Sequence, residues 1–385
     1  MKNRIYLDHA ATTPVSKAVL EVMLPYFISF PGNASAVYGT GRESRKAVEC
    51  ARRQVAKAIG AEPREILFTG SGSESDNLAV KGTAFAMRKK GRHIITTAIE
   101  HPAVLNTCIW LEKQGFTISY IEPDRKGRIN PGDIRKAAGE NTVLISVMAA
   151  NNEIGTIEPV SEIGTIAREK GIVFHVDAVQ AVGAIPVDVN EWKADLLSMS
   201  AHKFYGPKGV GALYIRRGTR IDPLVHGGEQ ERGLRAGTEN VAGIAGMGQA
   251  ILDATEKLQE NAGKTIRLRD RLITGILSVV PNVKLNGPEK CRLPSNCNIC
   301  FEGIDGEALL LRLDLAGIAG SSGSACTAGS QKISHVLKAI GLSDEQAKGS
   351  LRLTVGPDNT EDEIDETIRA VREIVEDLRS MFHGS

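Results

Sequence analysis

The strongest constraint on the fold is a series of short apolar runs that alternate with amphipathic stretches over the first two thirds of the chain. The stretches at residues 74–87 and 160–170 have helical periodicity. The apolar runs fall at residues 66–69, 93–97, 143–148, 173–177, 195–199 and 211–215. Strands that are apolar almost throughout are buried on both faces, so the pattern predicts an α/β fold with a mainly parallel sheet between helices.

The length of 385 residues predicts more than one domain. Residues 242–264 have the pattern of one long helix that could connect two domains, and the chain after it mixes shorter strands and helices. Residues 364–378 place apolar side chains on one helical face. We expect a large domain over residues 14–255 and a smaller one formed by residues 1–13 and 256–385.

The charge balance argues against DNA or membrane-surface binding. The chain has 47 Lys and Arg against 46 Asp and Glu, a formal net charge of +1, and no basic run. No stretch reaches the roughly 20 apolar residues of a membrane span, and the first residues lack the apolar core of a secretory signal. We therefore expect a cytoplasmic protein, and its six cysteines are too few for a disulfide scaffold.

A lysine stands at the end of one of the apolar runs. Lys203 lies within SMSAHKFYGPKG, residues 198–209, between an expected strand and a Gly/Pro turn. A lone lysine is more often a solvated loop residue. Held among polar groups, however, its amine could have a lowered pKa and form a Schiff base with an aldehyde.

An acid ends another apolar run, 26 residues before that lysine. Asp177 lies in FHVDAVQ, residues 174–180, at the strand end where open α/β sheets bind ligands. Such an anion could keep the pyridine nitrogen of pyridoxal 5′-phosphate (PLP) protonated, which makes the ring an electron sink. Gln180 could hydrogen-bond the phenolic oxygen. The alternative for Asp177 is a helix N-cap.

A phosphate group would need backbone donors, and the segment TGSGSESDN, residues 69–77, offers them. It combines small residues, hydroxyl groups and the start of a helix, including Gly72 and Ser73. Free N–H groups and the helix dipole favour an anion there, although such loops are often plain turns. Ser200 and His202, on either side of Ala201, could add further donors.

Three further polar residues follow expected strands or open a helix. His101 could stack on a cofactor ring and carry protons, although a histidine before Pro102 is more often structural. Asn152 could place an amide near the cofactor's phenolic oxygen. Arg352 could clamp a substrate carboxylate with its planar fork, or be an ordinary surface arginine on a strand.

Cys326 lies in GSSGSACTAGS, residues 320–330, where every other residue is small. This composition predicts an exposed, flexible loop, and an exposed thiol there favours a reactive role over an incidental surface cysteine. Cys297 and Cys300 form a CxxC with Cys291 nearby, so zinc or redox chemistry is an alternative. We nevertheless expect no metal site, because no second CxxC or histidine cluster accompanies them.

The two remaining cysteines, Cys50 and Cys108, fall in helical patterns and are expected in the core.

Four motifs carry a family resemblance: HVDAVQ at 175–180, SAHK at 200–203, RAGTEN at 235–240 and SSGSACT at 321–327. With them, and from LDHAATTP at 7–14 to the last helix, the chain resembles the bacterial NifS/IscS-type cysteine desulfurases.

These relatives are fold-type I PLP-dependent transferases. The resemblance therefore implies a large domain with a mainly parallel seven-stranded sheet and a smaller α+β domain. It also implies a set of cofactor-binding residues, namely Asp177, Gln180, Asn152, Gly72, Ser73, Ser200, His202, Lys203 and Thr238.

Within that set the resemblance assigns individual roles. Lys203 would carry the Schiff base, Asp177 would pair with the pyridinium, and His101 would stack on the ring. Thr238 would reach the phosphate of a neighbouring subunit, which implies a homodimer with shared active sites. Asn33 and Arg352 would hold the substrate carboxylate and its surroundings.

The implied reaction converts L-cysteine to L-alanine and leaves the sulfur as a persulfide on Cys326, with Lys203 and His101 moving protons. The sulfur would pass to an acceptor such as an iron–sulfur scaffold protein, for iron–sulfur cluster assembly or tRNA thiolation. The alternatives are a selenocysteine lyase, a PLP aminotransferase, or a sulfur carrier or regulator without turnover.

The chain departs from the relatives at three places. They usually read Ser-Gly-(Ala/Gly)-Thr-Glu where this chain has GSGSE at 70–74, in which Ser73 keeps the hydroxyl. Asn33 is followed by Ala34-Ser35 rather than Pro-Ser. The sequence ends at Ser385 soon after the last helical pattern, so docking to a scaffold protein through a C-terminal tail is not expected.

Overall fold

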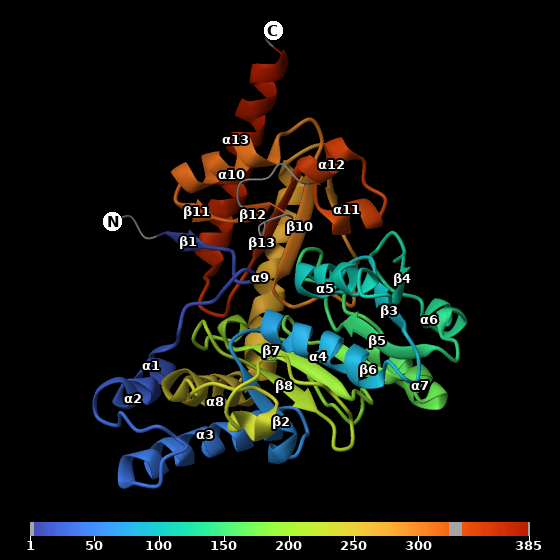
Figure 1. Ribbon diagram of the computed structural model, residues 1–385. Helices are drawn as coiled ribbons and strands as arrows, with labels where there is room; N and C mark the ends of the chain where they lie inside the picture. Colours follow the sequence, from blue (N-terminus) through green and yellow to red (C-terminus); the bar gives the residue numbers. More distant parts are fainter. Residues whose placement is uncertain (1–3, 323–332, 384–385) are drawn as a thin grey trace.

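The computed structural model describes residues 4–322 and 333–383. A large α/β part and a smaller part lie one above the other, and α9 (Leu258–Val279) runs from one into the other (Figure 1). None of the helices within the described ranges combines the length and the apolar character needed to cross a bilayer.

A seven-stranded sheet forms the centre of the large part, in the order β2-β8-β7-β6-β5-β3-β4. Its strands are β2 (Ile66–Thr69), β3 (His93–Thr97), β4 (Thr117–Ile121), β5 (Thr142–Met148), β6 (Val173–Asp177), β7 (Leu196–Ser200) and β8 (Gly211–Ile215). β3 to β7 pair in parallel, and β8 is antiparallel to both of its neighbours. The predicted mainly parallel seven-stranded sheet is therefore confirmed.

Successive side chains of the sheet pack into different cores. Ile95, Val147 and Val176 belong to the cluster that includes helices α3 and α8, whereas Ile94 and Leu144 pack with α4 and α5. This alternation follows from the two-residue period of a strand and explains why both faces are apolar. The helices of this part are α1 (Lys17–Met23), α2 (Pro25–Ile28), α3 (Gly39–Ala58), α4 (Gly72–Met87), α5 (Pro102–Glu112), α6 (Pro131–Ala137), α7 (Val160–Lys170) and α8 (Val241–Glu256).

The smaller part is an antiparallel sheet in the order β12-β13-β10-β9, with helices packed on it. Its strands are β9 (Val283–Leu285), β10 (Asn296–Phe301), β12 (Ser321–Ser322) and β13 (Ser350–Thr354). Its other helices are α10 (Gly306–Leu315), α11 (His335–Ala339), α12 (Asp344–Lys348) and α13 (Glu361–His383). β1 (Ile5–Tyr6) pairs in parallel with β11 (Ile318–Ala319), so the N-terminal segment lies against this part.

Two sequence expectations are wrong. The helical pattern over residues 242–264 is two helices, because Lys257 leaves the helical conformation (φ −99°, ψ 10°) between α8 and α9. Cys50 is exposed rather than in the core, since α3 turns Val48 and Ala51 inward instead. The proposed domain boundary at residue 255 stays a prediction.

The CxxC cysteines lie on β10. Cys297 and Cys300 are buried, three residues apart on a strand, so their side chains face opposite sides. Cys297 packs in the apolar core of the smaller part, and burial raises the pKa of its thiol to about 12. Within residues 4–322 and 333–383, no group of three or more His, Cys, Asp or Glu side chains is placed to hold a metal ion.

A buried ion pair fixes the segment before α8. Arg52 of α3 donates to both carboxylate oxygens of Glu231, at 2.9 and 2.8 Å, and the two side chains are 7% and 4% exposed. The Glu231 carboxylate also accepts from the Phe68 N–H of β2, at 3.0 Å. One carboxylate therefore joins α3, β2 and the segment that leads to Thr238.

We predict that Glu231→Gln lowers the free energy of unfolding by about 3 kcal/mol, because it removes the buried counter-charge of Arg52 and leaves the guanidinium with the half-exposed Glu49, at 3.2 Å. Asp365→Asn is the matched control, since Asp365 pairs with Arg271 on the surface, at 43% and 46% exposure. Its expected loss of stability is much smaller, because solvent screens an exposed ion pair. Denaturant unfolding of both variants in the same cofactor state measures the difference, and equal losses would contradict the prediction.

Candidate active site

The candidate site lies at the carboxyl edge of the parallel strands. Asp177 is the last residue of β6, and Lys203 ends the short helix η2 (Ala201–Lys203) that follows β7. Asn152 follows β5 on the same edge. Because parallel strands point the same way, their C-terminal ends bring these three residues to one edge of the sheet.

The Lys203 amine is held by the N-terminal segment. Its Nζ donates to the carbonyl oxygens of Ala10 and Ala11, at 2.5 and 2.9 Å. Gln180 Nε2 donates to the same Ala10 oxygen, at 3.0 Å. Lys203 is therefore not a solvated loop lysine, and it shares a backbone acceptor with Gln180.

Asp177 is a buried acid, 5% exposed. One carboxylate oxygen accepts the Val179 N–H, at 3.0 Å, in a turn that starts no helix, so the N-cap alternative does not hold. Burial raises the pKa of this carboxyl to about 6, and the Val179 N–H and the Lys203 charge act in the opposite direction. The acid is thus close to its titration range at neutral pH.

The start of α4 offers an anion-binding site. The Ser71 hydroxyl accepts the Glu74 N–H, and the Ser75 N–H binds the Ser71 carbonyl. Of the four N–H groups that begin the helix, those of Gly72 and Ser73 have no hydrogen-bond partner in the described chain. They remain available to a phosphate.

Close packing places that helix start beside the other site residues. A Cβ added at Gly72 would lie 2.8 Å from Val179 Cγ2 and 3.3 Å from Ser200 Cβ. A side chain at position 72 would therefore push α4 away from the ends of β6 and β7. Glycine here keeps the helix N-terminus next to the segment that carries Asp177.

Two neighbours of Lys203 were predicted as phosphate donors. Ser200 ends β7 and is 2% exposed. His202 Nδ1 hydrogen-bonds Thr12 Oγ1, at 3.1 Å. Burial, followed by the charges of Lys203 and Lys208, lowers the pKa of His202 to about 4, so the ring is neutral at pH 7.

His101 caps α5. Its Nδ1 accepts the Ala103 N–H, at 3.1 Å, which leaves the proton of the neutral ring on Nε2. Burial, and then the charges of Lys203 and His335, lower its pKa to about 4. His101 therefore has a structural role as an N-cap, and this cap fixes the ring and its tautomer.

Arg352 is buried, 3% exposed, so the surface-arginine alternative is wrong. Its guanidinium donates to the Asn152 carbonyl at 3.0 Å and to Asp8 Oδ1 at 2.9 Å, while its buried Nε has no partner in the described chain. Successive side chains of β13 face opposite sides of the strand, so Arg352 points to this cluster while its neighbours pack in the core. Asp8 was missed as a site residue, although it lies in the LDHAATTP segment.

Two expected site residues, Asn33 and Thr238, stand apart from this cluster. Asn33 lies exposed between α2 and α3, and its side chain accepts the Ser35 N–H at 2.8 Å. Thr238 is exposed before α8. In the described chain, neither hydrogen-bonds any residue of the Lys203 cluster. Cys326 lies outside the described residues.

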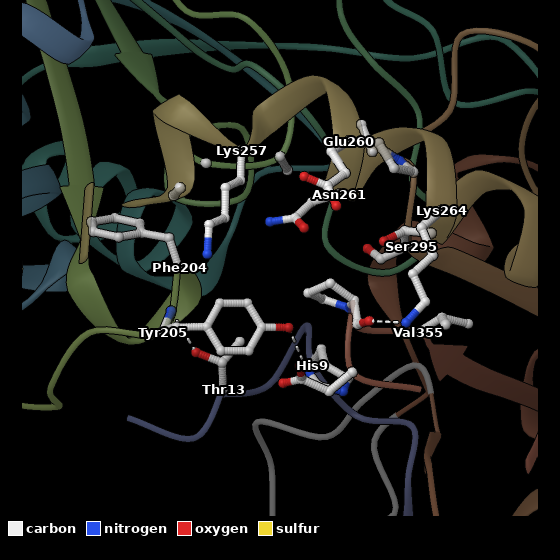
Figure 2. Close-up of a pocket in the computed structure, with 18 of the residues that line it drawn as sticks. His9, Thr13, Phe204, Tyr205, Lys257, Glu260, Asn261, Lys264, Ser295 and Val355 are labelled. Atoms are coloured by element: carbon white, nitrogen blue, oxygen red, sulfur yellow. Dashed lines mark hydrogen bonds between the residues drawn. The ribbon is translucent and has the colours of Figure 1, made fainter. Parts of the chain in front are cut away.

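A cavity of about 610 Å³ adjoins Lys203 on the side of α9. In Figure 2, Lys257 and Asn261 face His9 and Tyr205 across this cavity. The Tyr205 hydroxyl lies 3.3 Å from His9 Nδ1. The lining also includes Ala10 and Gln180, so the N-terminal segment that holds the lysine forms part of the cavity wall.

Together these groups fit PLP. Lys203 offers an amine for an aldehyde, Asp177 offers an acceptor for a ring N–H, and the free N–H groups of Gly72 and Ser73 suit a phosphate. The close approach at Gly72 brings the last two of these features together.

Comparison with known proteins agrees with this geometry. The family described as aminotransferase class-V matches residues 5–367. Curated relatives named cysteine desulfurase IscS come from Methanosarcina thermophila, 53% identical over 98% of this chain and 93% of the relative, and from Clostridium botulinum, 54% identical over 99% and 96%. A solved NifS-like protein superposes with a TM-score of 0.92 at 40% identity, covering 97% of this chain and all of the other.

The match spans both sheets and the Lys203 segment, and it covers almost the full length of each relative. The fold that the sequence predicted is shared with the solved relative. The chain therefore belongs to the class-V aminotransferase family and, within it, to the cysteine desulfurases, which are PLP-dependent enzymes.

Proposed function

We propose that this protein converts L-cysteine to L-alanine and keeps the sulfur as a persulfide on Cys326 for transfer to an acceptor. The observation that carries the proposal is the Lys203 amine, held at the carboxyl edge of the sheet beside Asp177 and the free N-terminus of α4. The curated relatives named cysteine desulfurase support the substrate.

We assign the cofactor to residues on that edge. Lys203 binds PLP covalently, and Asp177 accepts the pyridine N–H. Gly72, Ser73, Ser200 and His202 bind the phosphate, while Gln180 and Asn152 lie near the phenolic oxygen. The bound cofactor supplies an electron sink for the charge left at the substrate Cα.

Proton movement then falls to Lys203, and His101 supplies a hydrogen bond. The Lys203 amine removes the Cα proton, and the Ala10 and Ala11 carbonyls orient that amine. His101 stays neutral and carries its proton on Nε2, because the Ala103 N–H occupies Nδ1. From Nε2 it donates a hydrogen bond toward the substrate. The proton that the departing alanine takes comes from the Lys203 ammonium, since a neutral imidazole cannot give up its Nε2 proton without becoming an imidazolate anion.

Arg352 and Asn33 hold the substrate carboxylate in this proposal. Asp8 already occupies one arm of the Arg352 fork. A substrate carboxylate must therefore share the guanidinium with Asp8 or displace it. The buried Nε of Arg352, which has no partner in the described chain, is one of the donors left for a second acceptor.

The sulfur step balances without an external oxidant. The Cys326 thiolate attacks the substrate sulfur, the Cβ–S bond breaks, and an S–S bond forms on the enzyme. The substrate carbon is reduced to a methyl group and takes one proton, while the transferred sulfur is oxidised to the persulfide. The products are alanine and a persulfide on Cys326.

The wider setting is also a proposal. Thr238 is exposed in the single chain and would reach the phosphate site of a second subunit in a homodimer. We place the enzyme in the cytoplasm, with an iron–sulfur scaffold protein as one possible acceptor. The large domain of residues 14–255 would bind the cofactor, and the smaller domain of residues 1–13 and 256–385 would carry Cys326.

We predict that Cys326→Ala lowers alanine release from L-cysteine by at least about 100-fold, because the covalent acceptor is lost. Alanine and sulfide are measured with a reductant present. Cys50→Ala is the control, since Cys50 is also exposed, on α3, and should keep full activity. Full turnover in Cys326→Ala would instead favour a lyase or an aminotransferase.

PLP binding should weaken as the pH falls through about 6, where Asp177 takes up a proton and ceases to be an anion. Binding weakens toward low pH because the pKa of this acid is raised, and its charged form predominates only above that value. In Asp177→Asn, binding should be weaker by about 30-fold at pH 8, the loss of one charge-assisted hydrogen bond.

The measurement is reconstitution of the apo chain with PLP, followed by visible absorbance between pH 5 and 8. Between pH 5 and 8 the variant should show a smaller pH dependence than the wild type. His202 stays neutral over this window, because its pKa lies at about 4. The same pH slope in both proteins would count against Asp177 as the ring partner.

His101→Asn separates the cap from the chemistry. Asparagine is a good N-cap, so the free energy of unfolding should stay within about 0.5 kcal/mol of the wild type. Turnover should fall by about 100- to 1,000-fold, the usual cost of losing a hydrogen-bond donor aimed at the reacting groups. His101→Ala should in addition lose about 1 kcal/mol of stability. Unchanged turnover in His101→Asn would leave His101 with the cap alone.

A further inference from the structure

A buried polar row crosses the face of the sheet that α4 covers. It consists of Ser146 of β5, His175 and Asp177 of β6, and Ser198 of β7. In the strand register Ser146 stands beside His175, and Asp177 beside Ser198. Residues two apart on a strand share a face, so all four point toward α4.

Asp76 reaches this row from α4. It is 1% exposed, and its Oδ1 lies 3.7 Å from His175 Nε2. That same nitrogen hydrogen-bonds Ser198 Oγ at 2.9 Å, and the other ring nitrogen hydrogen-bonds Ser146 Oγ at 2.8 Å. Both nitrogens of the imidazole are thus already engaged by hydroxyl groups.

Asp76 lacks a counter-charge. In the described chain its ion-pair candidate is His175, and burial lowers the pKa of that ring to about 3, so it is neutral. Asp76 Oδ1 is also buried without a hydrogen-bond partner in the described chain. An ionised carboxylate in this place would be uncompensated, and a neutral acid costs far less to bury.

The charges that face Asp76 act mainly in one direction. Burial first, then the charges of Asp177 and, to a smaller extent, Glu100 raise its pKa well above the ordinary value, and a Ser198 hydrogen bond opposes them. Asp177 differs because the Val179 N–H and the Lys203 charge stabilise its anion. When two acids this close lose a proton, Asp177 is the one to ionise.

We propose that Asp76 is a positioning residue that keeps its proton at neutral pH, so that Asp177 is the single anion of the pair. A second charge at Asp76 would drive a proton onto Asp177 and remove the acceptor for the ring N–H. The first half of this inference, that Asp76 keeps its proton, concerns the chain alone. The second half, that Asp177 thereby stays the acceptor for the ring N–H, rests on the proposed cofactor function.

Infrared spectroscopy of the chain tests the first half without any turnover. A protonated carboxyl gives a carbonyl band that a carboxylate lacks. Isotope-labelled aspartate separates this band from those of the buried acids Glu100, Glu153 and Glu158, whose pKa values burial also raises. At pH 8 we expect the labelled aspartate band in the wild type and in Asp177→Asn, and its loss in Asp76→Asn. Asp365→Asn, which changes an exposed aspartate, is the control and should leave the band intact.

The second half is read from the pH midpoint of the visible absorbance of bound PLP. Asp76→Asn replaces a neutral acid with a neutral amide, so the midpoint should move by less than about 0.3 unit, whereas loss of a real charge would move it by about one unit. If the variant does not fold, isotope-labelled aspartate in the wild-type chain still reports the band.

Two results would overturn the proposal. One is a wild-type chain with no such band at pH 8, or one whose band disappears only in Asp177→Asn. The other is a midpoint shift of about one unit or more in Asp76→Asn. Because the infrared result does not depend on cysteine turnover, failure of the desulfurase assignment would leave it standing.

Discussion

The arrangement of the site depends on the contact between the Lys203 ammonium and the carbonyl oxygens of Ala10 and Ala11. A half-buried lysine needs acceptors, and the segment that supplies them begins at β1, which pairs with β11 of the smaller part. Two residues earlier, Asp8 binds Arg352 on β13. One short stretch of chain therefore links the large sheet, the smaller sheet and the reactive amine.

Burial governs the electrostatics of this edge. It raises the pKa of Asp177 and of Asp76, and it lowers that of His101, His175 and His202. The common cause is the doubly covered sheet, which the apolar strands produce and which leaves little water behind their ends. Charge survives where a donor compensates it, as at Asp177, whereas Asp76 and the three imidazoles are neutral.

The sequence predicted the parts of the site that depend on strand ends. The apolar runs located β2, β3 and β5 to β8, and Asp177 and Lys203 could be placed because each follows such a run. The close approach of α4 could also be anticipated from the glycines of the 69–77 segment. Local patterns of this kind carry their own physical signal.

What could not be predicted depends on backbone groups and on tertiary contacts. Two acceptors of Lys203 are main-chain carbonyls of alanines, which leave no mark in a sequence. The break between α8 and α9 falls at Lys257, an ordinary helix former, so propensity gave no warning. Asp76 has the spacing of any helical residue, and only the packing of α4 shows that it faces the sheet.

The antiparallel strand β8 explains why the helix start can lie so close to the strand ends. β8 returns between β7 and β2, and Gly211 pairs with both Ser200 and Thr69. A Cβ at Gly211 would lie 2.7 Å from the carbonyl carbon of Ser71, the N-cap of α4. The absence of side chains at Gly72 and Gly211 thus lets the turn before α4 sit against the sheet. The two free N–H groups of that turn then point to the same edge as Asp177 and Lys203, where one ligand can use all of them.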